Sequence, residues 1–285
     1  MCHFKRIEIN GQKPQIRNAP WGQDVPQMTS IARPKARWPS VLWIVRHGQS
    51  AGNVARDLAT EQGLSRIALQ HRDVDVPLSE LGRRQAEALG RWFAASAERP
   101  DVLLASPYIR AVQTGELFRS SGGCNPDEKI CIDERLREKE FGILDGLTPI
   151  GIHQVHPEQA EFRRTLGKFY HRPPGGESWV DVIFRLRALL DTISLHYAER
   201  KVMIVAHQVV VLCLRYILEN LSEAEILAID RAGDIANCAV TEYRLDQSLG
   251  HDGTMVLSQY NVTVPMELEH TPVTTAPDKM VAARG

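Results

Sequence analysis

The sequence predicts an α/β protein: a single three-layer α/β/α domain with a mostly parallel central sheet and helices on both faces. Two apolar runs, Val41–Val45 and Val202–Val205, have the length and the β-branched content of buried parallel strands. Helical patterns alternate with such runs, as a sheet covered on both faces requires. A chain of 285 residues is long enough to bury one core of this kind.

The first apolar run, Val41–Val45, fits either a strand or a short buried helix when it is taken alone. The second run far along the chain favours the strand, because both runs end in the same way. Further on, Ser79 is expected to cap a helix that continues to about Ala97, since apolar residues recur there near a 3.6-residue period.

The next strand and helix place a cation where anions bind. Leu103–Ala105 predicts a short buried strand. We expect Ser106 to cap the following helix and Pro107 to open it, which puts Arg110 on the first turn. Free backbone N–H groups at that position also attract anions.

The second half of the chain continues the alternation of helices and strands. Ser222 with Glu225 predicts a capping box. The other expected elements, in chain order, are a helix from about Trp179 to Glu199, a strand at Lys201–Val205, a covered helix at Val209–Leu218, and late strands at Ala239–Leu245 and Met255–Tyr260.

Composition divides the chain into three expected parts. Residues 1–40 are rich in Pro, Gln, Asn and Arg and predict an irregular N-terminal arm. Residues 41–262 form the one expected domain. Residues 263–285 lack periodicity, so we expect a disordered C-terminal tail.

Charge and cysteine content exclude several classes of protein. A net charge of −1 without a basic block argues against nucleic-acid binding. No run of eighteen apolar residues or signal-like start is visible, which argues against membrane insertion. Five cysteines, odd in number and without a CxxC pair, favour a reducing compartment, and we expect a cytoplasmic protein. Nothing in the sequence identifies an oligomeric partner.

Each long apolar run is followed by a histidine. His47 comes within the motif Arg46-His47-Gly48, and His207 follows the second run. A lone histidine is more often a buried core residue, but the carboxyl ends of parallel strands share the sheet edge where ligands bind. The Arg46 guanidinium suits phosphate or carboxylate, Gly48 allows close approach of the backbone, and Asn53 offers a neutral donor.

These residues resemble the histidine phosphatase superfamily, also called phosphoglycerate mutase-like, in which Arg-His-Gly ends the first strand. The matches keep the family's order from about Val41 to Asp246. The other matching segments are Asp75–Gly82 with Gln85-Ala86, Ser106–Ala111 with Gln113-Thr114, Leu136–Gly142 with Asp145-Gly146, and Gly176-Glu177-Ser178.

The resemblance implies phosphomonoester hydrolysis through a phosphohistidine, without a metal or another cofactor. His47 would attack phosphorus, and Glu138 would protonate the leaving oxygen and then activate water. The phosphoryl oxygens would be held by Arg46, Arg110, His207 and Asn53. The assignment of Glu138 as the proton donor depends on its position in the matching motif. Glu134 and Glu140 lie nearby, and a cluster of charges also fits a solvated face.

The expected substrate is a small phosphorylated metabolite, such as a sugar phosphate. Gln208 after the second histidine resembles the bisphosphatase domain of enzymes that control fructose 2,6-bisphosphate, and it could contact a sugar hydroxyl. Tyr170 and Arg172 fit either contact with the non-transferred end or a lid that packs on itself. Lys139, where many mutases carry Arg, favours phosphatase over mutase. A protein-directed phosphatase or a phospho-ligand binder remains the other alternative.

Overall fold

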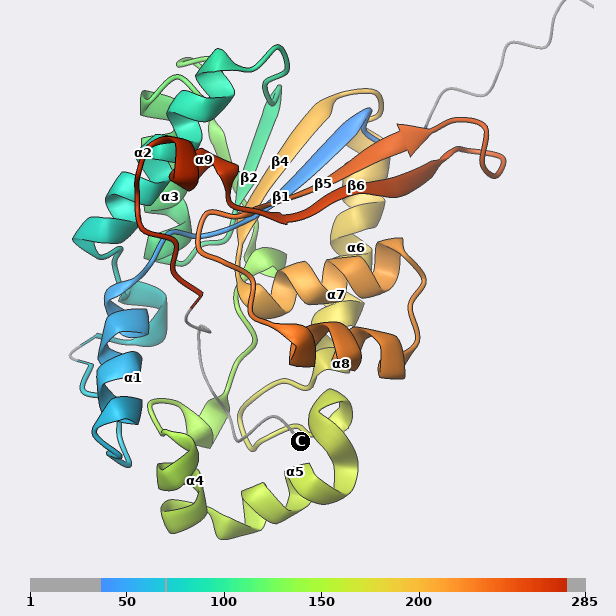
Figure 1. Ribbon diagram of the computed structural model, residues 1–285. Helices are drawn as coiled ribbons and strands as arrows, with labels where there is room; N and C mark the ends of the chain where they lie inside the picture. The colour runs from blue at the N-terminus through green and yellow to red at the C-terminus, as the bar shows by residue number, and fades with distance from the viewer. Residues whose placement is uncertain (1–36, 70, 276–285) are drawn as a thin grey trace, which may run out of the picture. The chain divides into compact units, whose positions relative to one another are not determined.

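The computed structural model describes residues 37–69 and 71–275. These residues contain a six-stranded sheet in the order β3-β2-β4-β1-β5-β6 (Figure 1). The strands are β1 (Val41–Arg46), β2 (Val102–Ala105), β3 (Ile130–Ile132), β4 (Lys201–Ala206), β5 (Val240–Asp246) and β6 (Thr254–Val262).

The central pair of strands is β1 and β4, which lie parallel in continuous register from Val41 opposite Lys201 to Arg46 opposite Ala206. All six β1 residues and all but Lys201 of β4 are buried. Burial on both faces explains why the sequence shows unbroken apolar runs here rather than alternation. The two predicted strands are confirmed, and a short buried helix at Val41–Val45 is ruled out.

The remaining pairings make the sheet mostly parallel, as predicted. β2 lies parallel to both β4 and β3, whereas β5 runs antiparallel to β1, and β6 runs antiparallel to β5. β1 therefore has its neighbours β4 and β5 from the last third of the chain.

Helices cover both faces of the sheet. The described α-helices are α1 (Ala51–Glu61), α2 (Glu80–Ala95), α3 (Ile109–Ser120), α4 (Pro149–Val155), α5 (Pro157–Tyr170), α6 (Trp179–His196), α7 (Gln208–Leu218), α8 (Glu223–Ala232) and α9 (Val264–Leu268). Short 3₁₀ turns, η1 to η3, lie at Asp73–Asp75, Glu134–Leu136 and Gly142–Leu144. No described helix has the length and apolar content needed to cross a membrane.

Alternate residues of β1 enter two different cores. Leu42 and Ile44 belong to a core with α6, α7 and α8. Val41, Trp43 and Val45 belong to a second core with α2, α3 and α9. This period of two is the strand geometry that separates the layers, and Figure 1 shows the two helix groups on opposite sides of the sheet. The predicted three-layer α/β/α architecture is confirmed.

A small separate core accompanies α4 and α5. Phe141, Leu144, Leu147 and Ile152 are buried together there, with Ala160 packed against them. In Figure 1 these two helices lie at the bottom of the view, on the side toward which β4 runs. They therefore stand on the side of the sheet where β1 and β4 end.

The serine caps predicted at Ser79 and Ser222 are confirmed. Ser79 accepts from Gly82 N at the start of α2, and capping boxes open α6 at Ser178 and α8 at Ser222. Their hydroxyl groups satisfy backbone donors that the first helical turn leaves over.

The predicted start of α3 at Pro107 was wrong, because this helix begins at Ile109 with Tyr108 as its cap. Ser106 N still donates to Val205 O at 3.0 Å, which continues the sheet ladder one residue past β2. The chain must leave the sheet before a helix can form. Arg110 nevertheless lies on the first turn of α3, as predicted.

The predicted disordered tail was wrong for residues 263–275. Met266 of α9 is fully buried in the core with α2. Beyond it, Asn237 N donates to Thr274 O at 2.8 Å, and Gln85 Nε2 donates to Pro272 O at 2.9 Å. One buried methionine and these bonds order a segment without helical periodicity. Residues 1–36 of the predicted arm and residues 276–285 lie outside the described part.

Candidate active site

Three adjacent parallel strands end at one edge of the sheet. β2 is followed by Ser106, β4 by His207 and β1 by His47. The ladder continues past β1, where His47 N donates to Ala206 O at 2.9 Å. The register that pairs β1 with β4 thus brings the two histidine rings to a centroid separation of 5.1 Å. Both histidines are fully buried.

The orientation of the His47 ring follows from its backbone contact. Its Nδ1 lies 2.6 Å from Gly48 O. Since a carbonyl oxygen accepts only, Nδ1 carries a proton and donates. On the other side of the ring, Arg110 Nε lies 3.2 Å from Nε2 and donates to it. Nε2 therefore carries the lone pair of a neutral imidazole.

The Arg110 guanidinium is held over this nitrogen by η1. It donates to Asp73 O at 2.6 Å, and its two terminal nitrogens lie 3.3 and 3.4 Å from the Asp73 carboxylate oxygens. Its carbon also stands 4.8 Å from the centroid of the Tyr108 ring. Arg110 is thereby fixed at the first turn of α3 with its charge beside His47.

The His207 ring contacts the segment that follows β2. Its Nε2 lies 2.8 Å from Ser106 Oγ, and the Tyr108 ring packs edge-on at 5.1 Å. Tyr108 in turn donates its hydroxyl to Glu140 at 2.8 Å, and burial followed by this bond raises the pKa of Tyr108 far above its usual value. Tyr108 thus remains a neutral donor that joins His207 to the Glu138–Glu140 segment.

Arg46 and Gly48 flank His47 in different ways. The fully buried Arg46 guanidinium donates to Ile235 O in the segment after α8. A Cβ atom on Gly48 would stand 2.4 Å from Gly82 O, inside the range that real Cβ atoms avoid. Tight packing of the β1–α1 loop on the first turn of α2 therefore requires this glycine. The sequence had suggested a different reason for Gly48, namely close approach of the backbone to a ligand.

The Glu138 carboxylate is almost fully buried, at 1% exposure. Its Oε1 accepts from Lys139 N at 2.8 Å. Burial, followed by the charge of Arg163, lowers the pKa of the Lys139 ammonium to about 8. Glu138 is therefore buried and does not belong to a solvated charged face. This favours its assignment from the motif over the interpretation as a surface charge cluster.

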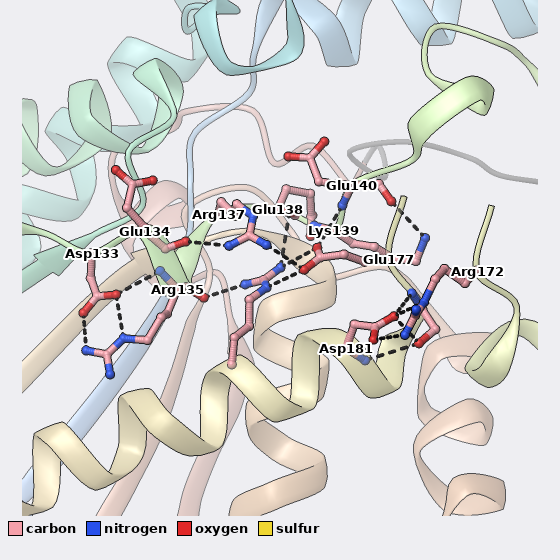
Figure 2. A network of polar contacts seen from close by, with 12 residues as sticks. Asp133, Glu134, Arg135, Arg137, Glu138, Lys139, Glu140, Arg172, Glu177 and Asp181 are labelled. Atoms are coloured by element: carbon pink, nitrogen blue, oxygen red, sulfur yellow. Dashed lines mark hydrogen bonds and ion pairs between the residues drawn. The ribbon is translucent and has the colours of Figure 1, made fainter. Parts of the chain in front are cut away.

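A polar network surrounds the main chain of the Glu138 segment (Figure 2). The Glu177 carboxylate accepts from Arg185 Nε at 2.9 Å, from the terminal Arg185 nitrogen at 3.0 Å, and from Arg137 at 2.9 Å. It also accepts from Glu140 N at 3.1 Å. Burial alone would raise the pKa of Glu177, but Arg185, Glu140 N and Arg137 together lower it. Glu177 is therefore a charged anchor.

The remaining predicted residues have local partners in the structure. Asn53 Oδ1 accepts from Ser50 N at 2.9 Å and closes the capping box of α1. Gln208 Nε2 donates to Asp234 at 2.7 Å. The Arg172 fork binds Asp181, and the Tyr170 ring is 55% exposed and packs on Phe169.

Several residues that shape this edge were not predicted from the sequence. Thr114 accepts from Gly48 N at 3.1 Å, and Asn237 donates to His47 O at 2.9 Å. Asp73 and Tyr108 hold the Arg110 side chain. Thr114, Tyr108 and Glu177 stood inside the matched segments, so their position was visible although their partners were not. No motif or sequence pattern marked Asp73 or Asn237.

Comparison with known proteins agrees with this geometry. The family model described as histidine phosphatase superfamily (branch 1) matches residues 42–252. The chain belongs to the histidine phosphatase superfamily. One superfamily relative, the 6-phosphofructo-2-kinase/fructose-2,6-bisphosphatase of Caenorhabditis elegans, is 31% identical over 62% of this chain and 33% of its own length.

Two other superfamily relatives are covered over most of their length. The 2,3-bisphosphoglycerate-dependent phosphoglycerate mutase of Sinorhizobium fredii is 31% identical over 67% of this chain and 85% of its own. A solved mycobacterial glucosyl-3-phosphoglycerate phosphatase superposes with a TM-score of 0.60 at 27% identity, covering 78% of this chain and 99% of that one. Among the bisphosphatase relatives, by contrast, this chain spans only about a third to a half of their length.

Proposed function

We propose that this protein is a phosphomonoester hydrolase that transfers a phosphoryl group from a small metabolite to His47 and then to water. The observation that carries the proposal is the state of the His47 ring. Its Nδ1 proton is committed to Gly48 O, and its Nε2 lone pair lies beside the Arg110 cation. A neutral, oriented imidazole nitrogen next to fixed positive charge is what phosphoryl transfer to histidine needs.

The first step forms the P–N bond and breaks the P–O ester bond. His47 Nε2 attacks phosphorus in line with the leaving oxygen. Arg46, Arg110 and His207 stabilise the charge on the non-bridging oxygens, with Asn53 as a neutral donor. The protonated Glu138 carboxyl gives its proton to the leaving oxygen, so the alcohol leaves neutral.

The second step reverses these roles with water. The Glu138 carboxylate takes a proton from water, whose oxygen attacks phosphorus as the P–N bond breaks. The bonding pair returns to His47 Nε2, and inorganic phosphate leaves. Glu138 regains its proton, which prepares it for the next turnover.

For the substrate we propose a sugar phosphate or a similar small phosphorylated metabolite. The relatives named as fructose-2,6-bisphosphatases and as a glucosyl-3-phosphoglycerate phosphatase support this class. Gln208, on the first turn of α7 directly after His207, is the proposed contact to a sugar hydroxyl. Because its guanidinium binds Asp181, Arg172 has a different proposed role, which is to hold the start of α6. Free thiols at the four described cysteines support a cytoplasmic location.

A phosphoglycerate mutase is the second candidate, because a mutase of Sinorhizobium fredii matches over 85% of its length. The chemistry of the first step would be the same. The two functions separate at the acceptor, since a mutase returns the phosphoryl group to a hydroxyl and excludes water. Lys139 beside Glu138, where mutases of this superfamily carry Arg, is the feature that favours the hydrolase.

The test is rapid mixing with a panel of phosphorylated metabolites, followed by an alkaline denaturing quench, which preserves phosphohistidine, and peptide mass spectrometry. We expect transient phosphorylation of His47, release of inorganic phosphate, and loss of both in His47→Asn. Transfer to 3-phosphoglycerate without phosphate release would identify the mutase. Tight binding of inorganic phosphate with no labelling from any donor would identify a phospho-ligand binder, and turnover by His47→Asn would overturn the mechanism.

A further inference from the structure

Glu177 and Arg185 form a bidentate ion pair beside the Glu138 segment. The two Arg185–Glu177 bonds measure 2.9 and 3.0 Å, and both side chains are about nine-tenths buried. A guanidinium that matches a carboxylate fork to fork fixes both partners in direction as well as in distance. The pair is therefore rigid compared with an exposed ion pair.

This pair holds the main chain on both sides of Glu138. Arg185 donates to the carbonyl oxygens of Arg135 and of Glu138, the latter at 3.4 Å. The Glu177 carboxylate accepts from Glu140 N, and Glu177 N donates to Glu140 O at 2.9 Å. These contacts fix the chain before Glu138, at Glu138 and after it (Figure 2).

The side chain of Glu138 depends on that main chain. Its Oε1 accepts from Lys139 N, the amide between the two clamped positions. A shift of the segment would therefore move the carboxyl group itself. Glu177 and Arg185 are themselves held firmly, because they lie just before and on α6, which is capped at Ser178 and buries one face in the core.

We propose that Glu177 and Arg185 are positioning residues that hold Glu138 in place to protonate the leaving oxygen. The inference rests on the proposed hydrolase mechanism, in which Glu138 is the acid. Neither residue needs to touch the substrate. Their contribution is selective for substrates with poor leaving groups, since only these need a well-placed proton.

The experiment compares kcat for an alkyl phosphate with kcat for p-nitrophenyl phosphate. For Arg185→Met we expect a loss on the order of 10²-fold with the alkyl ester and only a few-fold with the aryl ester. The basic limb of the alkyl-ester pH profile should flatten as well, since the acid no longer contributes. Arg185→Lys and Glu177→Gln, which keep a donor or an acceptor, should restore part of the ratio.

Arg137→Met is the matched control, because Arg137 binds the same Glu177 carboxylate but neither of the carbonyls that Arg185 holds. We expect it to leave the ratio within about twofold, as for a half-exposed ion pair. Equal losses on both substrates in Arg185→Met, or in the two milder variants if that one does not fold, would overturn the inference. Phosphorylation of His47 by p-nitrophenyl phosphate is measured separately in the unmodified protein. If His47 is not phosphorylated there, the proposed function is refuted rather than the role of Glu177 and Arg185.

Discussion

The single carboxyl group of Glu138 illustrates how burial assigns a role at the scale of the residue. Glu138 is 1% exposed and accepts from the adjacent amide, in a segment that also carries the half-buried Arg137 and Glu140. Sequence position alone left Glu138 among several acidic neighbours. The structure separates Glu138 from them, because Glu134 is exposed and Glu140 is half-buried and accepts from the Tyr108 hydroxyl.

Glu138→Gln is predicted to separate leaving groups. The amide keeps the shape of the side chain but has no proton to give, so kcat for an alkyl phosphate should fall on the order of 10²- to 10³-fold. For p-nitrophenyl phosphate the fall should be slight, because that leaving group needs no acid. Steady-state kinetics on both esters measures this, and an equal fall would remove Glu138 from the role of acid.

His171 is predicted to make stability depend on pH. Burial first, and then the charges of Arg163 and Lys139, lower the pKa of this histidine to about 4, from an ordinary 6.5. The unfolded chain therefore binds a proton between pH 6.5 and about 4 that the folded chain refuses, so stability falls as the pH falls through this window. After allowing for solvent screening, the loss is on the order of 2 kcal/mol.

Urea unfolding of His171→Gln across pH 4 to 7 checks this effect. The variant should show a flatter dependence than the unmodified protein. His196→Gln, which changes an exposed histidine near the end of α6, is the control and should leave the slope unchanged. The same slope in His171→Gln and in the unmodified protein would show that His171 does not titrate in this way.

At the scale of elements, the connection between β1 and α1 packs directly on α2. Gly48→Ala is predicted to destabilise the protein by about 3 kcal/mol, because its Cβ would meet Gly82 O at 2.4 Å and backbone must move. Chemical denaturation measures the loss. Gly233→Ala is the control, since nothing lies within 4 Å of its Cβ position and its extended backbone suits any residue.

How far the sequence predicts these elements depends on where their partners lie. β1, β4 and the caps at Ser79, Ser178 and Ser222 were predictable because apolar runs and caps are local signals. The start of α3 was not, since Ser106 is held in the ladder by Val205, a residue far away in sequence. The short α4, the mostly exposed α5 and the three-residue β3 bury too little of their own surface to leave a pattern.

The same distinction applies to the site. His47, His207 and Arg110 stand in motifs and on predicted elements, so their meeting at one edge was foreseeable. Asp73 and Asn237 reach that edge only through tertiary packing, which no local pattern encodes. For Arg172 the sequence left open a substrate contact or a lid that packs on itself. In the structure Arg172 binds Asp181, which also closes the capping box of α6, and no local pattern indicates this pairing.

At the scale of the whole described chain, its last residues bond to Asn237, which in turn bonds to the residue after the first strand. Thr274 Oγ1 donates to Asn237 at 2.9 Å and accepts from Gln85 at 3.0 Å, and Asn237 holds the His47 carbonyl. The segment after α9 therefore touches the support of the proposed nucleophile.

Thr274→Val is predicted to lower the free energy of unfolding by about 1 to 2 kcal/mol, because two buried partners each lose a hydrogen bond. It should also lower kcat a few-fold by loosening Asn237 behind His47. Thermal or urea unfolding together with steady-state kinetics tests both effects. Thr275→Val, at an exposed neighbouring position, is the control, and equal behaviour of the two variants would contradict the coupling.

The place of β1 in the sheet has a consequence for how the protein is made. Both of its neighbours, β4 and β5, begin at or after Lys201, whereas β1 begins at Val41. During synthesis both edges of this apolar strand therefore stay unpaired until about 150 further residues have been made, and an unpaired apolar strand is prone to aggregation and a target for chaperones. His47 and His207 come together only when β4 has paired with β1. The onset of activity in a nascent or refolding chain therefore reports the closing of the sheet.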